Sequence, residues 1–138
     1  MGVGPNYVLD KGFLAEGSTA YAIGEIVKAG SVDGAIGRST TSSATVINVG
    51  VSQEAVDASK VTTGKVILDV RLLGVARVIA GATIAVGDHL TNDTSARATP
   101  VTRAAAGAQP AHTFGIALTS TSTVGEHIDV LLTPGGTY

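Results

Sequence analysis

Short apolar runs, each closed by a glycine and an acidic residue, are the feature that most constrains the fold of this chain. The clearest case is the stretch from Val75 to Leu90, in which β-branched residues flank Gly81 and lead to Gly87-Asp88. β-Branched residues favour the pleated surface of a sheet, and glycine adopts positive φ angles in tight turns without steric cost. The stretch therefore predicts a strand, a bend and a second apolar run that ends in a tight turn.

The same order of an apolar run, a glycine, an acid and further apolar residues occurs earlier, at Ala22–Val27. Two more pairs of glycine-centred segments match in the same order: Val49-Gly50-Val51 with Phe114-Gly115-Ile116, and Gly64-Lys65-Val66-Ile67 with Gly125-Glu126-His127-Ile128. Three ordered matches favour an internal pseudo-repeat. We therefore expect an N-terminal arm at residues 1–13 and one β domain at 14–138, with similar halves at about 14–74 and 75–138.

The spacing of apolar residues predicts strands rather than helices. From Lys65 to Leu73, Val66, Leu68, Val70 and Leu72 recur at every second position, which is the period of a half-buried strand. Ser52–Lys60 has room for a helical turn or two before the next glycine, and Arg103–Pro110 is compatible with a loop or a single helical turn. We expect an all-β fold of many short strands with little helix, because the chain lacks the crossover helices that a parallel sheet requires.

The amino-acid composition is typical of a domain that buries small apolar side chains and carries few surface charges. Of the 138 residues, 44% are hydrophobic and 14% are charged, and there is no cysteine. A chain of this length buries roughly two-thirds of its unfolded surface, which is enough for a core without disulfides or metals. A charge-poor surface loses little ionic solvation on contact, and this favours close packing against a protein partner.

The distribution of charged and apolar residues disfavours two classes of partner. The net charge is −2 and the basic residues are scattered singly, without the basic stripe of a nucleic-acid-binding protein. No apolar run approaches the ~20 residues that span a bilayer, and the N-terminus lacks the pattern of a secretory signal. We therefore expect no direct contact with nucleic acid or with a membrane.

No set of residues has the spacing of a catalytic, metal or cofactor site. His89, His112 and His127 lie in separate segments without ligand-like spacing. The acids Glu25 and Asp88 are interpreted as turn formers that accept hydrogen bonds from nearby backbone N–H groups. We therefore expect a protein that is not an enzyme and that uses no cofactor. The residues expected to shape turns are Gly24, Glu25, Gly81, Gly87, Asp88 and Gly115.

The segment from Asn6 to Phe13 contains a short apolar run followed by a turn signal, Asp10-Lys11-Gly12. One interpretation is a first strand that pairs within the fold. The other is an extended arm that adds to the sheet edge of a neighbouring protein. For the second interpretation, the candidate contact residues are Asn6, Tyr7, Val8, Leu9 and Phe13.

Three segments carry a resemblance to a known family: Ala80–Leu90, Gly115–Leu118 and Gly125–Leu132. In these segments the chain resembles the capsid cement or head decoration proteins of tailed bacteriophages. The resemblance covers about residues 6–133 and is stronger in the second half. Its motifs are structural turns. The segment Val101–His112 departs from the shorter connection that the family leads us to expect.

The resemblance implies a small β-barrel of the β-clip or β-tulip style and a structural role in the virion. Such proteins are made in the host cytoplasm and usually assemble as homotrimers on the outer surface of the expanded head. They bridge major capsid protein subunits and stabilise the shell against the pressure of the DNA inside. Many weak contacts, summed over a symmetric array, give an avidity that no single contact has. The arm from Asn6 to Phe13 is then expected to contact the capsid by strand addition.

Three alternatives remain open at the level of the sequence. The chain is compatible with a shell or fibre subunit that assembles by itself. Glycine-aspartate turns also occur in β-clip modules associated with sugar-acid enzymes, although the convergent acidic and basic residues of such a site are absent. A biotinyl or lipoyl carrier requires a modifiable lysine at a hairpin tip, and Lys60 and Lys65 lack the expected neighbours.

Overall fold

A computed structural model describes residues 8–41 and 46–138 of the chain. In these residues the fold is nearly all β, as the sequence predicts. The strands of the first half are β1 (Leu9–Ala15), β2 (Ile26–Ala29), β3 (Ala35–Arg38), β4 (Asn48–Ser52) and β5 (Ile67–Leu73). Those of the second half are β6 (Val75–Ile79), β7 (His89–Asn92), β8 (Ala98–Pro100), β9 (His112–Ala117) and β10 (His127–Thr137). The single short helix, α1 (Ala58–Val61), lies within the segment expected to hold a helical turn.

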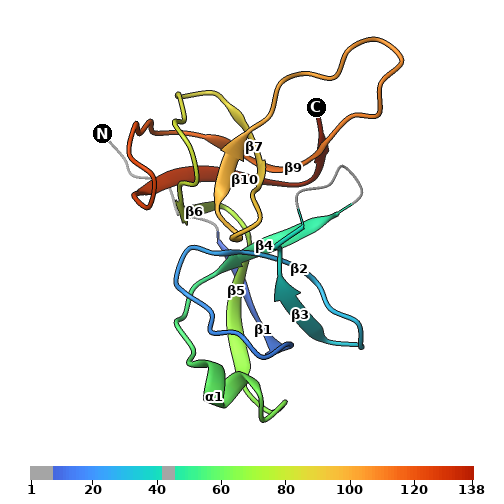
Figure 1. The fold of residues 1–138 in the computed structure, drawn as a ribbon, viewed down its shortest axis with the longest axis vertical. Helices are drawn as coiled ribbons and strands as arrows, with labels where there is room; N and C mark the ends of the chain where they lie inside the picture. The colour runs from blue at the N-terminus through green and yellow to red at the C-terminus, as the bar shows by residue number, and fades with distance from the viewer. Residues whose placement is uncertain (1–7, 42–45) are drawn as a thin grey trace.

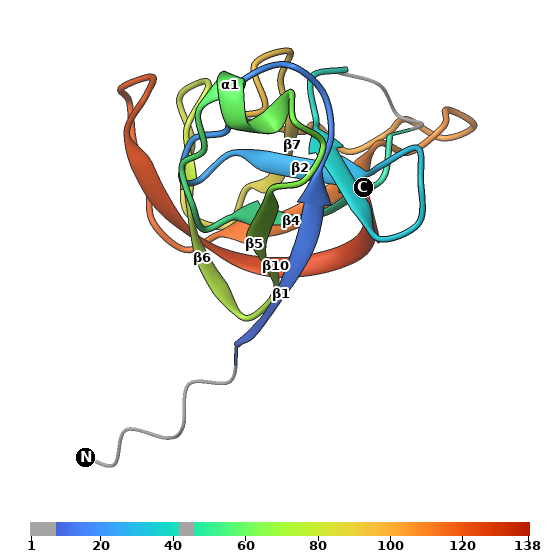
Figure 2. The ribbon, with the colours of Figure 1, turned by 90° about the horizontal axis from the view of Figure 1, so that it is seen from below.

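The two halves form two sheets that lie one above the other along the long axis of the molecule (Figure 1). The first sheet is a closed barrel in the order β1-β3-β2-β4-β5, and the second is a five-stranded sheet in the order β6-β10-β9-β7-β8. Figure 2 views the molecule from the end of the first barrel that carries α1. Gly74, at a φ of +101°, separates the last strand of the barrel from the first strand of the second sheet.

The strand order confirms the predicted pseudo-repeat. If β6 to β10 are matched in order with β1 to β5, every antiparallel pair of the barrel occurs again in the second sheet. The parallel pair β1–β3 closes the barrel, and its counterpart is a single parallel bridge between Ala80 and Ala98. The second half is therefore the same barrel with one weakly closed side.

The strand pairing corrects one of the three sequence matches by one residue. Ile67 pairs with Leu14 in the barrel, and the residue in the corresponding place of β10 is His127, which pairs with Ile79. The sequence match, by contrast, aligns Ile67 with Ile128. Two residues separate Gly64 from Ile67, whereas one separates Gly125 from His127, so the two connections differ in length by one residue.

Each half has its own apolar core. The core of the barrel is built from side chains that point inward from its strands and loops: Ala15, Tyr21, Val27, Ile36, Val56, Val61, Leu68 and Val70. The second core includes Val78, Leu90, Phe114, Ile128 and Val130, but it also takes in Ile26 and Val51 from the first half. Both of these borrowed side chains have a relative exposure of 0%. Burying an aliphatic side chain of this size contributes about 2 kcal/mol, so this contact holds the halves together.

A buried polar network crosses the same junction. Asn48 Nδ2 donates to Asn92 Oδ1 at 3.0 Å, and Asn92 Nδ2 donates to the carbonyl oxygen of Ser39 at 2.8 Å. Ser39 Oγ in turn donates to Asn48 Oδ1. Every member is buried. Because an unpaired polar group is costly in such a place, the network favours one relative position of the halves.

Candidate functional site

The predicted contact residues of the N-terminal segment lie in different environments. Asn6 and Tyr7 fall outside the described residues. Val8 and Leu9 are exposed, whereas Phe13 is partly buried against the barrel core. From Leu9 to Leu14, β1 pairs with β5 of the same barrel. The arm boundary expected at residue 13 therefore does not coincide with the structure, because residues 9–13 already belong to the barrel.

The two glycine-acid turns have the same geometry in both halves. Gly24 and Gly87 each have a φ of +89°, which is the value that the third position of a type II turn requires. In each turn the acid accepts a hydrogen bond from the backbone N–H three residues earlier, at 2.6 Å for Glu25 and at 2.9 Å for Asp88. Both acids therefore fix local backbone. Glu25 also pairs with Arg38, at 2.5 Å.

Gly81 and Gly115 are placed where another part of the chain passes close by, and neither has a positive φ. A Cβ on Gly115 would lie 2.7 Å from the carbonyl oxygen of Leu131, and one on Gly81 would overlap the Asp93 carboxylate. Gly50, the counterpart of Gly115 in the barrel, has the same kind of close neighbour on β5. Gly50 and Gly115 permit close contact between strands, whereas Gly81 lies in the bend that follows β6.

The outer face of the second sheet carries a row of side chains that are partly or fully exposed. The row crosses four adjacent strands, and its members are His89, Ile116, Leu131 and Val75. Leu131 is 41% exposed. His89 stacks on the ring of Tyr138, with centroids 3.8 Å apart. We call these four residues the outer row.

The barrel has a counterpart of the outer row. The matching residues of β2, β4, β5 and β1 are Ile26, Val51, Arg71 and Asp10. In the barrel, however, the first two residues are buried against the second half. The other two form an ion pair, in which Arg71 Nε lies 2.8 Å from Asp10 Oδ1.

The mouth of the barrel is an open apolar pocket. Its lining includes the half-buried Phe13, Val49 and Leu72, the buried Ile36, and Val32 at the rim, which is 58% exposed. We call it the barrel pocket.

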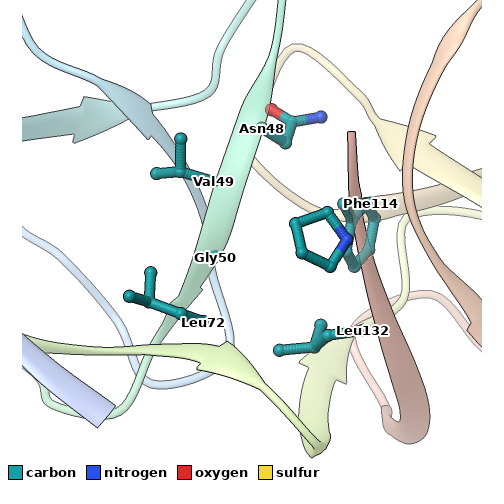
Figure 3. A pocket seen from close by; sticks show the side chains of 7 residues that line it. Asn48, Val49, Gly50, Leu72, Phe114 and Leu132 are labelled. Atoms are coloured by element: carbon teal, nitrogen blue, oxygen red, sulfur yellow. The ribbon is translucent and has the colours of Figure 1, made fainter. Parts of the chain in front are cut away.

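The counterpart of the barrel pocket in the second half is filled. Phe114 and Leu132 take the places of Val49 and Leu72, and both are buried. They face β4 of the first half across a seam without room for a water molecule. Figure 3 shows that Val49 and Leu72 point away from this seam.

Four ionisable groups have shifted pKa values, each for a structural reason. The pKa of Arg71 is raised by its hydrogen bonds to Asp10. Hydrogen bonds from Arg71 hold the pKa of the Asp10 carboxyl below its usual value. The pKa of Glu16 is lowered because its carboxylate accepts hydrogen bonds from the backbone N–H and hydroxyl of Ser31. Burial raises the pKa of the Tyr21 hydroxyl, which donates to the carbonyl oxygen of Glu16 at 2.7 Å. Each of these contacts holds the backbone or a neighbouring side chain in place.

The described residues offer no cluster of side chains suited to metal binding. His89 stacks on Tyr138, whereas His127 Nε2 lies 3.3 Å from the carbonyl oxygen of Ile23. No described helix has the length and apolar character needed to cross a membrane. The long connection at 101–111 has no regular structure. Its last residue, Ala111, exchanges two backbone hydrogen bonds with Tyr138.

Sequence reasoning missed both the outer row and the barrel pocket. Alternating apolar residues show that a strand has two unlike faces, but they do not show which face a second sheet covers. Ile26-Val27 and Val49-Gly50-Val51 are apolar on both faces, which is the signal of strands covered on both sides. The corresponding His89-Leu90 and Phe114-Gly115-Ile116 are nearly as apolar. They carry the same signal of strands that are covered on both faces.

Comparison with known proteins gives a likeness in fold. No family model matches the chain, and no curated protein sequence matches it. Among solved structures, the chain is similar to the N base of the head fiber protein gp8.5 of bacteriophage phi29, with a TM-score of 0.63 and 21% sequence identity. The alignment covers 92% of this chain and 95% of that one. The two proteins therefore share this fold over almost their full aligned lengths.

Proposed function

We propose that the protein is a structural component of a tailed-phage virion that decorates the outside of the head. It binds there as a homotrimer, bridges neighbouring major capsid protein subunits and catalyses no reaction. The observation that carries this proposal is the fold shared with a phage head fiber base over 92% of the chain. The sequence segments that resemble head decoration proteins support it independently.

The surface chemistry is suited to this role. The exposed apolar side chains Leu9, Leu73 and Leu131 come from strands at the junction of the two halves, and the exposed Val8 directly precedes β1. Only 14% of the residues are charged. Apolar contacts with few ion pairs depend little on ionic strength, whereas contacts between exposed charges are screened by salt. A bound decoration protein of this kind should therefore stay on its shell in high salt.

The direct test is sedimentation of the purified chain with empty expanded heads that lack it. We expect saturable co-pelleting in a fixed ratio to the major capsid protein, unchanged between low and high salt, while the protein alone stays in the supernatant. Absence of co-pelleting at micromolar concentrations would overturn the proposal.

The role of the N-terminal segment needs a variant that leaves the barrel intact. Deletion of residues 1–13 would remove most of β1, so loss of binding would have no clear meaning. A deletion of residues 1–7 retains every residue of β1. We expect it to reduce occupancy on heads while the melting temperature stays within about 2 °C of that of the full chain. Undiminished occupancy would show that the segment makes no capsid contact.

A second candidate is a fibre base or shell subunit that assembles by itself. It is favoured by the solved neighbour, whose name describes the base of a head fiber. Electron microscopy of the purified protein separates the candidates, because filaments or shells in the absence of heads indicate self-assembly. Discrete small particles that bind heads indicate decoration.

A further inference from the structure

We infer that the outer row of one copy docks into the barrel pocket of a second copy, so that the protein assembles head to tail. The inference rests on the duplicated fold and does not require the proposed function. The internal junction between the two halves serves as the template for the contact.

The first step is the way in which the halves meet inside one chain. The first half presents the face of β2 and β4, with Ile26 and Val51, to the second half. This face covers the mouth of the second barrel, where Phe114 and Leu132 lie. A backbone hydrogen bond from Ile26 N to the carbonyl oxygen of Ala96 fixes the contact at 2.8 Å. We call the covering face of a half, formed in the first half by β2 and β4, the plug. We call the open end that it covers, where Phe114 and Leu132 lie in the second half, the mouth.

The second step is that this junction is not symmetric. A two-fold junction would repeat each contact with the halves exchanged, so that His89 N would donate to the loop at residues 30–34. Among the described residues His89 N makes no such bond, and its ring stacks on Tyr138. The contact between the halves therefore uses neither the plug of the second half, which is the outer row, nor the mouth of the first half, which is the barrel pocket.

The third step is that both leftover surfaces keep an apolar character. On the plug side, Ile116 takes the place of Val51, and Leu131 takes the place of Arg71. On the mouth side, Val49 and Leu72 take the places of Phe114 and Leu132 and remain half buried. Exposed apolar surface of this kind on a charge-poor protein marks an interaction site.

The fourth step is that the two loops at the mouths have the same shape. Ala96 has a φ of +61°, the single positive value among the described residues other than glycine, and Gly34 has +76° at the matching place. The Gly34 carbonyl corresponds in position to the Ala96 carbonyl that accepts from Ile26 N in the internal junction, but it already accepts from Leu14 N at 2.9 Å, so a second donor would share this oxygen. Transferred to two copies, His89 N–H of one chain lies near the loop at residues 30–34 of the next.

A head-to-tail contact generates either a closed ring or an open filament. Three copies in a ring, the number proposed above for the decorating form, would place six barrels around one axis. The contact between chains would then imitate the contact within each chain. Each copy uses both surfaces once, so disruption of either surface abolishes the ring.

The test uses two variants that each destroy one surface. Ile116→Asp places a charge on the outer row, and Val32→Asp places one at the rim of the barrel pocket. Both side chains are at least partly exposed in the single chain, so the fold should persist, as circular dichroism and thermal melting will verify. Val124→Asp is the matched control, because Val124 is 54% exposed and lies in neither surface.

Light scattering coupled to size-exclusion chromatography then gives the mass. We expect the wild type and Val124→Asp to form the same oligomer, and each surface variant alone to be monomeric. An equal mixture of Ile116→Asp and Val32→Asp should form dimers, because the mixture retains one intact plug and one intact mouth. A monomeric wild type, an unchanged oligomer in either surface variant, or a mixture that stays monomeric would overturn the inference. Head binding by a monomer would overturn this inference and the proposed homotrimer, but it would leave the proposed decoration of the head intact.

Discussion

The two halves of the molecule share one strand order but complete their cores differently. The barrel closes on itself through the parallel pair β1–β3 and leaves its pocket open. The second half is held on that side by one bridge, and side chains from the barrel complete its core. One half of a duplicated fold can therefore cover the open end of the other half. In every chain this leaves the barrel pocket uncovered and the outer row without a pocket to cover.

The largest expected effect comes from breaking the junction that serves as the template. Val51→Asp buries a carboxylate in the second core, where the cross-strand Arg71 is already paired with Asp10, and should cost about 3 kcal/mol of unfolding free energy. Ile116→Asp changes the matching residue on the exposed row and should cost less than about 1 kcal/mol in the monomer. Urea unfolding of the two variants at low protein concentration measures both values. Equal losses would show that the two rows are not in different environments.

The paired glycines should respond alike, because they occupy the same place in both halves. Gly50→Ala and Gly115→Ala each force a Cβ against the neighbouring strand and should each cost about 3 kcal/mol. Gly37→Ala is the control, since its nearest neighbour would be the Lys28 side chain at 3.8 Å. Thermal melting compares the three. A loss confined to one of the first two variants would contradict the structural equivalence of Gly50 and Gly115.

The polar network should be the next most sensitive feature. Asn92→Ala leaves the buried amide of Asn48 and the carbonyl of Ser39 without their partner, and should cost about 2 kcal/mol. Ala29→Asn introduces the same side chain at the matching exposed place in the barrel and should change stability by less than about 0.5 kcal/mol. If denaturant unfolding gives Asn92→Ala the stability of the wild type, the network does not position the halves.

The smallest expected effect is electrostatic. The pKa of Asp10 is lower in the folded chain than in the unfolded one, so its ion pair with Arg71 stabilises the fold above the unfolded pKa, near 3.8. This contribution is lost as the pH falls through the lower folded pKa. It amounts to less than about 1 kcal/mol for an exposed pair. Melting temperatures of the wild type and Asp10→Asn should differ at pH 6 and converge below pH 3; a constant difference would contradict this explanation.

The repeat was predictable from the sequence because its markers are local. Gly24 and Gly87 reflect a backbone angle, and Gly50 and Gly115 reflect close strand contact, so each leaves a glycine in the sequence whatever surrounds it. The first strand was left open between two interpretations. Asp10 and Lys11 suggested a turn, although both are exposed on a strand that Asp10 anchors to Arg71.

The candidate surfaces were not predictable in the same way. Whether the side chain of Val51 or that of Ile116 is covered depends on how the two sheets dock, and docking is not a property of either segment alone. The buried amides of Asn48 and Asn92 lie far apart in sequence, and each resembles an ordinary loop or strand-end polar residue when read by itself. The contacts between the two sheets could therefore be identified only from the structure.

Cross-linking between copies tests the central claim most directly, because the chain contains no cysteine of its own. We propose to prepare Val32→Cys and Ile116→Cys as separate proteins and to treat each alone, and then an equal mixture, with a short bifunctional maleimide. The head-to-tail account predicts cross-linked dimers in the mixture and none in either protein alone. Dimers from a single variant, or no dimers in the mixture, would contradict it.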